Sequence, residues 1–562
     1  MEALDWLVIG VFFLALIGII VWVVRQKQND SADYFLGGRD ATWLAIGASI
    51  FASNIGSEHL IGLAGAGASS GMAMAHWEIQ GWMILILGWV FVPFYTRSMV
   101  YTMPEFLERR YNPQSRTILS VISLVSYVLT KVAVTVYAGG LVFQQVFGIK
   151  ELWGIDFFWI AAIGLVVLTA LYTIFGGMKS VLYTSVLQTP ILLLGSLIIL
   201  VLGFKELGGW DEMMRVCGAV TVNDYGDTMT NLIRSNDDAN FPWLGALIGS
   251  AIIGFWYWCT DQFIVQRVLS GKNEMEARRG TIFGAYLKLL PVFLFLIPGM
   301  IAFALHQKYI GAGGEGFLPM LANGTANADA AFPTLVAKLL PAGVKGLVVC
   351  GILAALMSSL ASLFNSSAML FTIDFYKRFK PETPEKKLVG IGQIATIVIV
   401  VLGILWIPIM RSVGDVLYTY LQDVQSVLAP GIAAAFLLGI CWKRTSAQGG
   451  MWGLISGMVI GLTRLGAKVY YSNAGEVADS TFKYLFYDMN WLFFCGWMFL
   501  FCIIVVIVVS LATEAPTAEK IQGLVFGTAT KEQKAATRAS WNHWDIIHTA
   551  VSYTHLTLPT IL

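Results

Sequence analysis

The feature that most constrains this chain is a polar run inside its second long apolar segment. Residues 51–62 read FASNIGSEHLIG, which places serine, asparagine, glutamate, histidine and glycine at the depth of a membrane. A continuous helix facing lipid does not tolerate such a run, because lipid offers no partner to a polar side chain or a loosened carbonyl. We therefore expect these residues to face a cavity, another helix or an ion.

Apolar runs of about 20 residues, the length that crosses a hydrocarbon core, recur along the whole chain. Of the 562 residues 57% are hydrophobic and 13% charged, and mean hydropathy is +0.70, whereas a soluble chain carries about 25% charged residues. The runs lie near 5–24, 41–70, 75–96, 118–146, 153–175, 181–203, 243–265, 280–306, 343–376, 388–410, 416–441, 448–468 and 491–511, and a shorter one begins near 542. The sequence predicts an all-α polytopic membrane protein.

Basic residues predict the orientation of these helices. Arg25, Lys27 and Arg39 follow the first run, and the later basic clusters fall on the same side when the runs alternate. Because loops rich in lysine and arginine stay in the cytoplasm, we expect the N-terminus outside, in a plasma or bacterial inner membrane. The net charge of +1 gives no indication of a nucleic-acid partner, and the oligomeric state stays open.

Two runs carry unusual polarity at their middles, 41–70 and 243–265, and they lie five spans apart. An odd offset gives the two helices opposite orientations in the membrane. Paired broken helices in inverted repeats are the best sequence indication of the midplane site of a secondary transporter. The alternative is that both are polar packing seams between helices.

A small-residue stripe in the run 343–376 suggests an ion site. Ala355, Ser358 and Ser359 follow the spacing i, i+3, i+4 and therefore share one helical face. Hydroxyl and carbonyl oxygens suit a weakly held alkali cation, and without a carboxylate a monovalent ion is favoured over calcium or magnesium. Serines at this spacing are also common in helix packing, which is the alternative.

Ionisable residues inside the runs form a second candidate set: Glu58, His59, Glu78, Asp261 and Lys288. A charge at membrane depth costs about 2.5–3.5 kcal/mol, so each needs a functional or structural partner. Glu78 and Lys288 could bond a polyol as acceptor and donor, and Gln422 could add a bifunctional amide. Lys131 also lies in a run, and we expect its amine to reach the interface.

Aromatic residues could stack on a sugar ring or close the cavity over it: Trp77, Trp256, Tyr257, Trp258 and Tyr418. For each alone, a packed core or interfacial position is the competing interpretation. No nucleophile–base pair or metal constellation indicates an enzyme.

At these residues the chain resembles the sodium/solute symporter family, and most closely its sodium/glucose cotransporters. The motifs are FASNIGSEHLIGLAGAGA, FWYWCTDQFIVQR, AYLKLLPVFLFLIPGM, LMSSLASLFNSSAMLFTIDFY and APGIAAAFLLGICWKR. The resemblance implies a LeuT-like core of five-plus-five inverted repeats, about 41–203 and 243–441, with one helix before it and about three after. It covers a single domain, 1–551. The last helix looks truncated, and we expect 552–562 to be an atypical tail, non-native or disordered.

The resemblance also assigns roles to residues. It implies a sodium site of three carbonyls and two hydroxyls, from Ala52, Ile55, Ala355, Ser358 and Ser359. It implies a sugar site that includes Asn54, His59, Glu78, Lys288 and Gln422. The implied gates are Tyr257 on the inner side with Trp258 beside it, and Leu63, Trp77 and Tyr418 on the outer side.

Two departures bear on stoichiometry. Ser185 stands where the family usually has an aspartate, and Ala361 where members that bind two sodium ions have a threonine. We expect sodium-coupled import of a monosaccharide by alternating access, with one sodium per sugar. The alternatives are another solute (inositol, a sugar acid or an amino acid), proton coupling through Glu58 or His59, and a sugar-binding sensor or channel that does not accumulate its ligand.

Overall fold

The computed structural model describes residues 1–562 except 27, 29, 57, 322–323, 414–416, 474–477 and 562. Within helices, the side chains of residues 58, 129–130, 409–413, 417–423, 473 and 558–561 are also outside the description. Glu58, Tyr418 and Gln422 are among these, so the roles predicted for the side chains of Tyr418 and Gln422 lie outside the described residues.

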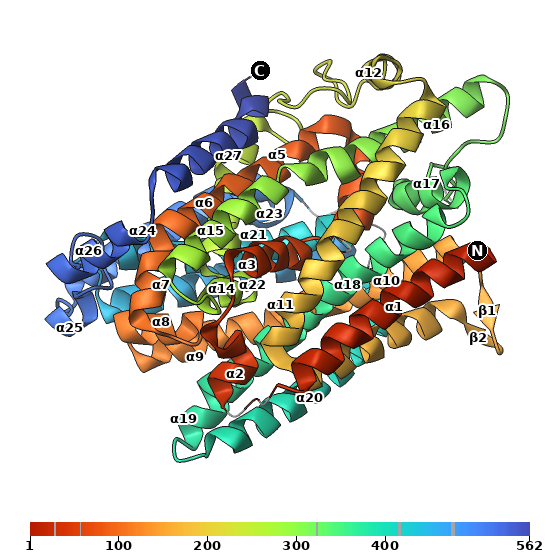
Figure 1. Ribbon diagram of the computed structural model, residues 1–562. Helices are drawn as coiled ribbons and strands as arrows, with labels where there is room; N and C mark the ends of the chain where they lie inside the picture. The colour runs from red at the N-terminus through yellow and green to blue at the C-terminus, as the bar shows by residue number, and fades with distance from the viewer. Residues whose placement is uncertain are drawn as a thin grey trace.

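The chain is a bundle of helices, in which η marks a 3₁₀ or π turn (Figure 1). The first half consists of α1 (Ala3–Val24), α2 (Ser31–Leu36), η1 (Gly37–Arg39), α3 (Trp43–Asn54), η2 (Glu58–Leu63), α4 (Ala64–Ser70), η3 (Gly71–Met74), α5 (Ala75–Ile79), η4 (Gln80–Trp82), α6 (Met83–Ile86), η5 (Leu87–Phe91), α7 (Val92–Ser98), α8 (Met103–Arg110), α9 (Pro113–Ser126), η6 (Tyr127–Val132), α10 (Ala133–Phe147), the antiparallel strands β1 (Glu151–Leu152) and β2 (Ile155–Asp156), α11 (Phe157–Leu207) and α12 (Trp210–Gly218).

The second half consists of α13 (Trp243–Gly254), η7 (Phe255–Thr260), α14 (Gln262–Leu269), α15 (Glu274–Leu287), η8 (Val292–Leu296), α16 (Ile297–Gly311), η9 (Ala328–Ala330), α17 (Ala331–Leu339), α18 (Val344–Met369), η10 (Leu370–Tyr376), α19 (Lys377–Phe379), α20 (Glu385–Val413), α21 (Leu417–Cys441), α22 (Ala447–Asn473), α23 (Thr481–Lys483), η11 (Tyr484–Asp488), α24 (Trp491–Ala512), α25 (Ala518–Ile521), α26 (Lys531–Ala539) and α27 (His543–Ile561).

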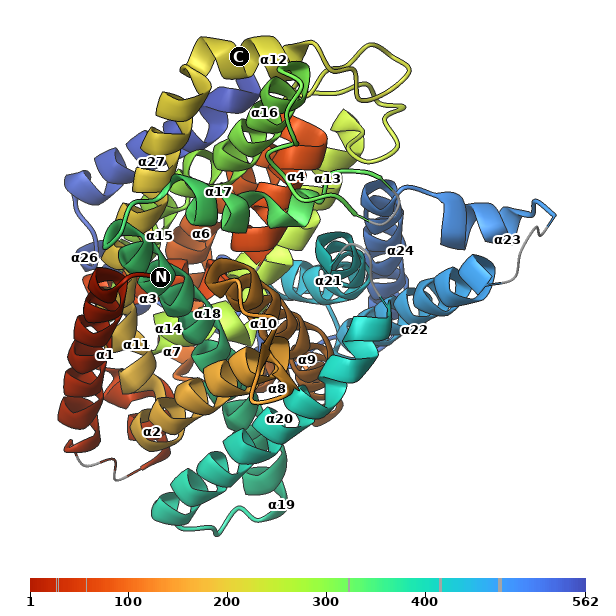
Figure 2. The same ribbon diagram turned by 90° about the vertical axis from the view of Figure 1, so that its right-hand side faces the viewer.

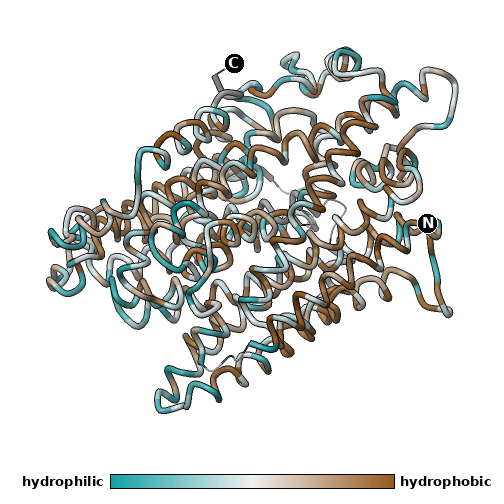
Figure 3. The backbone as a smooth tube through the Cα atoms, viewed as in Figure 1, coloured by the Kyte–Doolittle hydropathy of each residue, from teal (hydrophilic) through white to brown (hydrophobic). Residues whose placement is uncertain are grey.

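Helix α18 forms the centre of the bundle, and it packs against α11, α1, α20 and α3. The most apolar stretch of the helix that contains it is 94% buried, compared with 22% for α1 and 33% for α24. Helices α21, α22 and α24 contact one another and form a separate group beside the bundle (Figure 2). The outer helices α1 and α20 are hydrophobic along most of their length (Figure 3). Apolar outer surfaces of this kind match a protein whose periphery faces lipid.

Within the described residues, nine helices are long and apolar enough to cross a membrane. Most of the sequence run 153–175 and all of the run 181–203 lie in the single element α11. That element is broken at Gly177, whose φ of +53° is open to glycine but strained for other residues. A methyl group added there would lie 2.4 Å from the carbonyl oxygen of Tyr34, so the close approach of α2 also requires glycine.

The two polar runs break their helices, as the sequence predicted. Helix α3 ends at Asn54, Ile55 is extended (φ −79°, ψ 101°), and a π turn begins at Glu58. Helix α13 continues through the π turn η7 to Thr260, and the extended residue Asp261 then caps α14 by accepting the amide of Phe263. At each break an extended residue, Ile55 or Asp261, interrupts the helical conformation.

At the C-terminal end, α27 continues through the segment that the sequence marks as atypical. The helix runs to Ile561, and Leu556 is 2% exposed against the bundle. This segment is therefore helical in its described part. Whether it is native to the protein stays a prediction.

Candidate functional site

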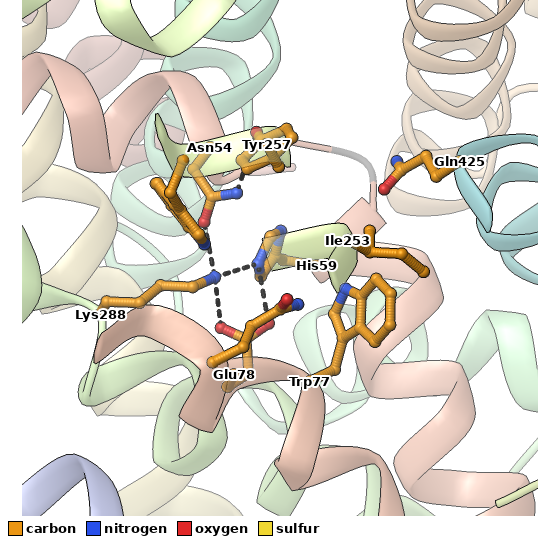
Figure 4. Close-up of a pocket in the computed structure, with 10 residues that line it drawn as sticks. Asn54, His59, Trp77, Glu78, Ile253, Tyr257, Lys288 and Gln425 are labelled. Atoms are coloured by element: carbon orange, nitrogen blue, oxygen red, sulfur yellow. Dashed lines mark hydrogen bonds and ion pairs between the residues drawn. The ribbon is translucent and has the colours of Figure 1, made fainter. Parts of the chain in front are cut away.

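A small cavity lies beside the break in α3. It has a volume of about 30 Å³, which holds about one water molecule. Ten residues from both broken helices, from α5, η4 and α21 and from the C-terminal cap of α15 line it (Figure 4): Asn54, His59, Trp77, Glu78, Gln80, Ile253, Tyr257, Trp258, Lys288 and Gln425. Four of the five predicted sugar ligands are in this set, and the fifth, Gln422, is outside the described side chains.

A charged cluster occupies one side of the cavity. Lys288 Nζ lies 2.5 Å from Glu78 Oε2 and donates to Asn54 Oδ1 at 2.6 Å. His59 Nε2 lies 3.2 Å from Glu78 Oε1 and 3.2 Å from Lys288 Nζ. With its proton on Nε2, a neutral His59 donates to Glu78. The side chains are at most 6% exposed, so the opposite charges of Lys288 and Glu78 compensate each other in a dry environment.

Tyr257, the predicted inner gate, contacts this cluster directly. Asn54 Nδ2 donates to its hydroxyl oxygen at 3.1 Å, and its ring meets that of Trp258 edge-on with centroids 4.9 Å apart. The structure thus places Tyr257 and Trp258 side by side at the cavity, on the π turn that precedes the second helix break.

Behind Tyr257 lies a second buried pair, which corrects one expectation. Lys131 does not reach an interface: its Nζ lies 2.7 Å from Asp261 Oδ2, and Lys131 is 3% exposed. The ammonium is 4.8 Å from the centroid of the Tyr257 ring, and Tyr127 donates its hydroxyl to the other oxygen of Asp261. Lys131 therefore pairs with the residue at the second helix break, and its ammonium contacts the ring of the predicted inner gate, Tyr257.

One of the predicted sodium ligands, Ser359, contacts the last turn of α3 next to the first helix break. Ser359 Oγ donates to the carbonyl oxygen of Ser53 at 3.0 Å, and a methyl group added at Gly56 would lie 3.0 Å from the same Oγ. Ser358 Oγ lies 3.3 Å from Ser185 Oγ, on α11. The other three predicted ligands are also buried, at most 1% exposed: Ala52, Ile55 and Ala355. The hydroxyl of Ser359 thus faces the backbone at the end of α3, and that of Ser358 faces a hydroxyl of α11. These partners are hard oxygens, and none of them is a carboxylate.

Of the predicted outer gates with described side chains, one lines the cavity and the other does not. Trp77 lines the cavity, and its ring lies 5.6 Å from that of Trp491 on α24. Leu63 is fully buried and does not line the cavity.

Sequence reasoning missed two carboxamides of the cavity, Gln80 and Gln425. Both are nearly buried, 7% and 8% exposed. A glutamine inside an apolar run is itself a signal, and these two follow Glu78 and Gln422 by two and three positions. In a helix, however, an isolated amide looks the same whether it faces a cavity or a neighbouring helix.

Comparison with known proteins shows the family to which this chain belongs. The profile of the sodium:solute symporter family matches residues 34–457. The sodium/myo-inositol cotransporter 2 of Mus musculus is 37% identical over 542 residues, which cover 94% of this chain and 80% of the relative. The sodium/glucose cotransporter 4 of Danio rerio is 36% identical over 537 residues, covering 92% of this chain and 80% of the relative.

Among solved structures, a Na⁺-coupled sialic acid symporter in a substrate-bound, outward-open state has a TM-score of 0.73 to this chain, at 22% identity. The match covers 92% of this chain and 99% of the symporter. This likeness shows the fold, and it confirms the predicted all-α, LeuT-like architecture. Together, the profile, the relatives and the fold show that this chain belongs to the sodium:solute symporter family: it is a multi-pass membrane transporter that couples solute movement to sodium, and not an enzyme.

Proposed function

We propose that this symporter imports a neutral polyol, either a monosaccharide such as glucose or galactose or a cyclitol such as inositol. The observation that carries this proposal is the charge compensation in the cavity. The one ammonium and the one carboxylate among the described lining residues, Lys288 and Glu78, pair at 2.5 Å. A solute with a net charge would leave an uncompensated charge in a buried site, which is expensive.

Hydroxyl groups suit this lining because each one both donates and accepts. A polyol hydroxyl can accept from Lys288 or Asn54 while it donates to Glu78. The indole rings of Trp77 and Trp258 offer apolar faces to the C–H side of a ring, as in aromatic stacking on sugars. Gln422, whose side chain is not described, completes the proposed set of five ligands.

The relatives support both solute classes. The names of the mouse and zebrafish proteins refer to myo-inositol and to glucose, which are neutral and carry hydroxyls around a six-membered ring. The cyclitol is therefore the second candidate, and the monosaccharide remains the first because of the motif resemblance. A sugar acid is disfavoured by the compensated charge of the cavity.

In the proposed cycle, sodium binds between the end of α3 and the hydroxyls of Ser358 and Ser359, with the carbonyls of Ala52, Ile55 and Ala355. This stabilises an outward-open form in which the neighbourhood of Asn54 is ordered for the solute. Coupling requires that both ligands favour the same state, because a ligand that binds two states equally shifts nothing. Tyr257 then opens on the inner side.

One sodium per solute is the proposed stoichiometry. Ser185, at the position where an aspartate would add charge, contributes only a hydroxyl, 3.3 Å from that of Ser358. Ala361 is buried and has no oxygen in its side chain. One ion crossing 100 mV down a tenfold gradient releases about 3.7 kcal/mol, which sustains roughly a 500-fold solute gradient. One ion is therefore sufficient for strong accumulation.

The basic loops favour an orientation with the N-terminus outside. Location in a plasma or bacterial inner membrane and a single transport domain over 1–551 are part of the same proposal. The experiment is uptake of labelled glucose and labelled myo-inositol into vesicles containing the purified protein, with and without an inward sodium gradient. We expect uptake of at least one of them above its outside concentration only with sodium. Sodium-independent equilibration would indicate a channel, and accumulation driven by a pH gradient alone would indicate proton coupling.

A further inference from the structure

Gln80 is a buried polar group of the cavity to which neither the motifs nor the proposed function gives a role. It begins η4, directly after α5, and follows Glu78 by two residues. It is 7% exposed, and its Oε1 atom has no hydrogen-bond partner within the described part of the chain. Buried polar atoms normally have partners, so an orphaned one in the lining of a binding cavity points to a ligand that supplies the bond.

The helix that faces Gln80 leaves space for its amide. A methyl group added at Gly254, at the end of α13, would lie 2.4 Å from Gln80 Oε1 and 3.3 Å from Gln80 Cδ. Any residue with a Cβ at this position would therefore displace the amide. Gly254 also directly precedes the π turn that carries Tyr257. The backbone of α13 thus approaches the amide of Gln80 closely, one turn before Tyr257.

We propose that Gln80 is a specificity-determining ligand that binds one hydroxyl of the solute and so selects against polyols that lack this hydroxyl. The inference rests on the proposed transport of a neutral polyol and deepens it. A carboxamide presents an acceptor and a donor, and a hydroxyl satisfies either one, whichever way the amide is turned. A solute without the hydroxyl leaves the amide buried and unpaired, which is the arrangement by which proteins discriminate most strongly against a deoxy analogue.

Gln425 is a second carboxamide in the cavity lining, and it lies away from the charged cluster. In Figure 4 its amide lies on α21, across the cavity from Glu78 and Lys288. Polar groups at more than one side of the cavity match a solute that carries hydroxyls around its ring, and they do not match a solute with one polar end. This distribution is independent of the orphaned atom of Gln80 and supports the same solute class.

The alternative is that Gln80 only fills a seam between η4 and α13. The two roles differ in what a substitution changes. A seam residue affects stability or the maximal rate for all solutes alike. A ligand changes the ratio between a solute and the analogue that lacks the contacted hydroxyl.

The test is transport by the wild type and by Gln80→Leu in proteoliposomes, with labelled glucose, myo-inositol and each monodeoxy analogue of glucose. For the wild type we expect one deoxy analogue whose ratio of maximal rate to half-saturation is roughly tenfold below that of glucose. In Gln80→Leu, the ratio of maximal rate to half-saturation for glucose should fall roughly tenfold, to the value for that analogue. The values for the other analogues, divided by the value for glucose, should stay as in the wild type. Unchanged ratios for every analogue would overturn the proposal.

Gly254→Ala serves as a second variant, because alanine favours the helix and so preserves the fold. Its methyl group displaces the amide of Gln80. It should therefore abolish the preference for glucose over the same deoxy analogue, as Gln80→Leu does. If Gln80→Leu does not fold, Gly254→Ala decides alone. Gln393→Leu is the matched control: this half-buried amide on α20 bonds the carbonyl oxygen of Ile174, away from the cavity, and its loss should leave all ratios unchanged.

The failure of this inference is distinguishable from failure of the proposed function. If the wild type accumulates none of the polyols in a sodium gradient, the proposed function is wrong. If the wild type accumulates glucose or myo-inositol, and both variants keep all ratios, only the role of Gln80 is wrong.

Discussion

Two buried lysine–carboxylate pairs lie close to Tyr257, and they are almost alike in geometry. Lys288 and Glu78 are 2.5 Å apart, and Lys131 and Asp261 are 2.7 Å apart. All four residues are at most 4% exposed. The nitrogen–oxygen distance and the burial alone would give both pairs the same role.

Their surroundings separate them. The Glu78–Lys288 pair lines the cavity (Figure 4). Lys288 donates a hydrogen bond to Asn54, and the ring of His59 lies against the carboxylate of Glu78. The Lys131–Asp261 pair does not line it. The ammonium of Lys131 lies 4.7–5.5 Å from the centroids of four rings, those of Tyr127, Trp256, Tyr257 and Phe263. That of Lys288 lies over the ring of Trp258, at 5.5 Å.

This difference teaches that a buried charge in a transporter is informative through its neighbours rather than through its own partner. A pair amid hydrogen-bonding groups can exchange its partners for a solute. A pair enclosed by aromatic rings cannot do so without losing cation–π contacts, and it holds those rings in position. We therefore propose that the first pair binds the solute and that the second holds the ring of Tyr257 in position.

The largest expected effect comes from neutralising the cavity pair. Lys288→Met alone leaves the Glu78 carboxylate buried without its cation, which costs about 3–5 kcal/mol and should lower the melting temperature of the purified protein. The double variant Glu78→Gln/Lys288→Met restores charge balance and should fold. Its uptake should nevertheless fall more than about 100-fold, because two charge-assisted bonds to the solute are lost. Uptake near the wild-type level in a folded double variant would remove this pair from the site.

Neutralising the Lys131–Asp261 pair should lower the maximal rate of uptake rather than the affinity for the solute. Lys131→Met/Asp261→Asn also balances charge, so the protein should fold. We expect the half-saturation for the solute to change by less than about threefold, while the maximal rate falls because Tyr257 loses its support. Kinetics of labelled uptake separate the two quantities. If this variant loses solute affinity as strongly as the cavity variant, the distinction between the pairs is wrong.

A smaller effect is expected where neither pair is touched. Ser359→Ala removes one proposed sodium ligand and its bond to the carbonyl of Ser53. The sodium concentration for half-maximal uptake should rise roughly fivefold, as expected for one lost oxygen contact. Ser196→Ala, an equally buried serine on α11 away from the helix break, is the control. Equal sodium activation curves for both variants would exclude Ser359 from the site.

The smallest effect is expected at a carboxyl that has no ion pair in the described part of the chain. Asp329 lies in η9, outside the spanning helices, against Gly65 on α4. Burial raises its pKa from 3.8 to about 6. The folded state therefore holds the proton more tightly than the unfolded state, and its stability falls as pH rises from about 4 to about 6.

Replacing this carboxyl removes the cost of burying its charge. At pH 7.5, Asp329→Asn should raise the melting temperature by about 1 °C or more, and near pH 4 the two proteins should melt together. Thermal melts in detergent at the two pH values check this. A variant that is less stable than the wild type at pH 7.5 would show that the carboxylate has a favourable partner.

The sequence alone predicts much of this arrangement. The two helix breaks follow from serine, asparagine, glycine and aspartate in apolar runs, because such residues cannot face lipid. The predicted contact between α3 and the serines of α18 follows from the family resemblance. Figure 1 shows these distant segments converging at the centre of the bundle.

What the sequence does not predict are side-chain pairings over long separations. Lys131 and Asp261 are 130 positions apart, and nothing local indicates that they meet. The same holds for Gln80, whose proposed role depends on the close approach of Gly254 on α13. Two expected spans follow each other directly in α11, with a kink at Gly177 between them. A single glycine can redirect a helix without a loop.

Simultaneous uptake of labelled sodium and labelled glucose or myo-inositol in the same vesicles tests the central claim most directly. The purified protein is placed in vesicles with an inward sodium gradient, and initial rates of both labels are measured with and without the other ligand. The account predicts that each flux depends on the other, with one sodium for each solute molecule. Solute uptake that proceeds without sodium would contradict sodium coupling by the site at the α3 break, and a flux ratio near two would contradict the single sodium site.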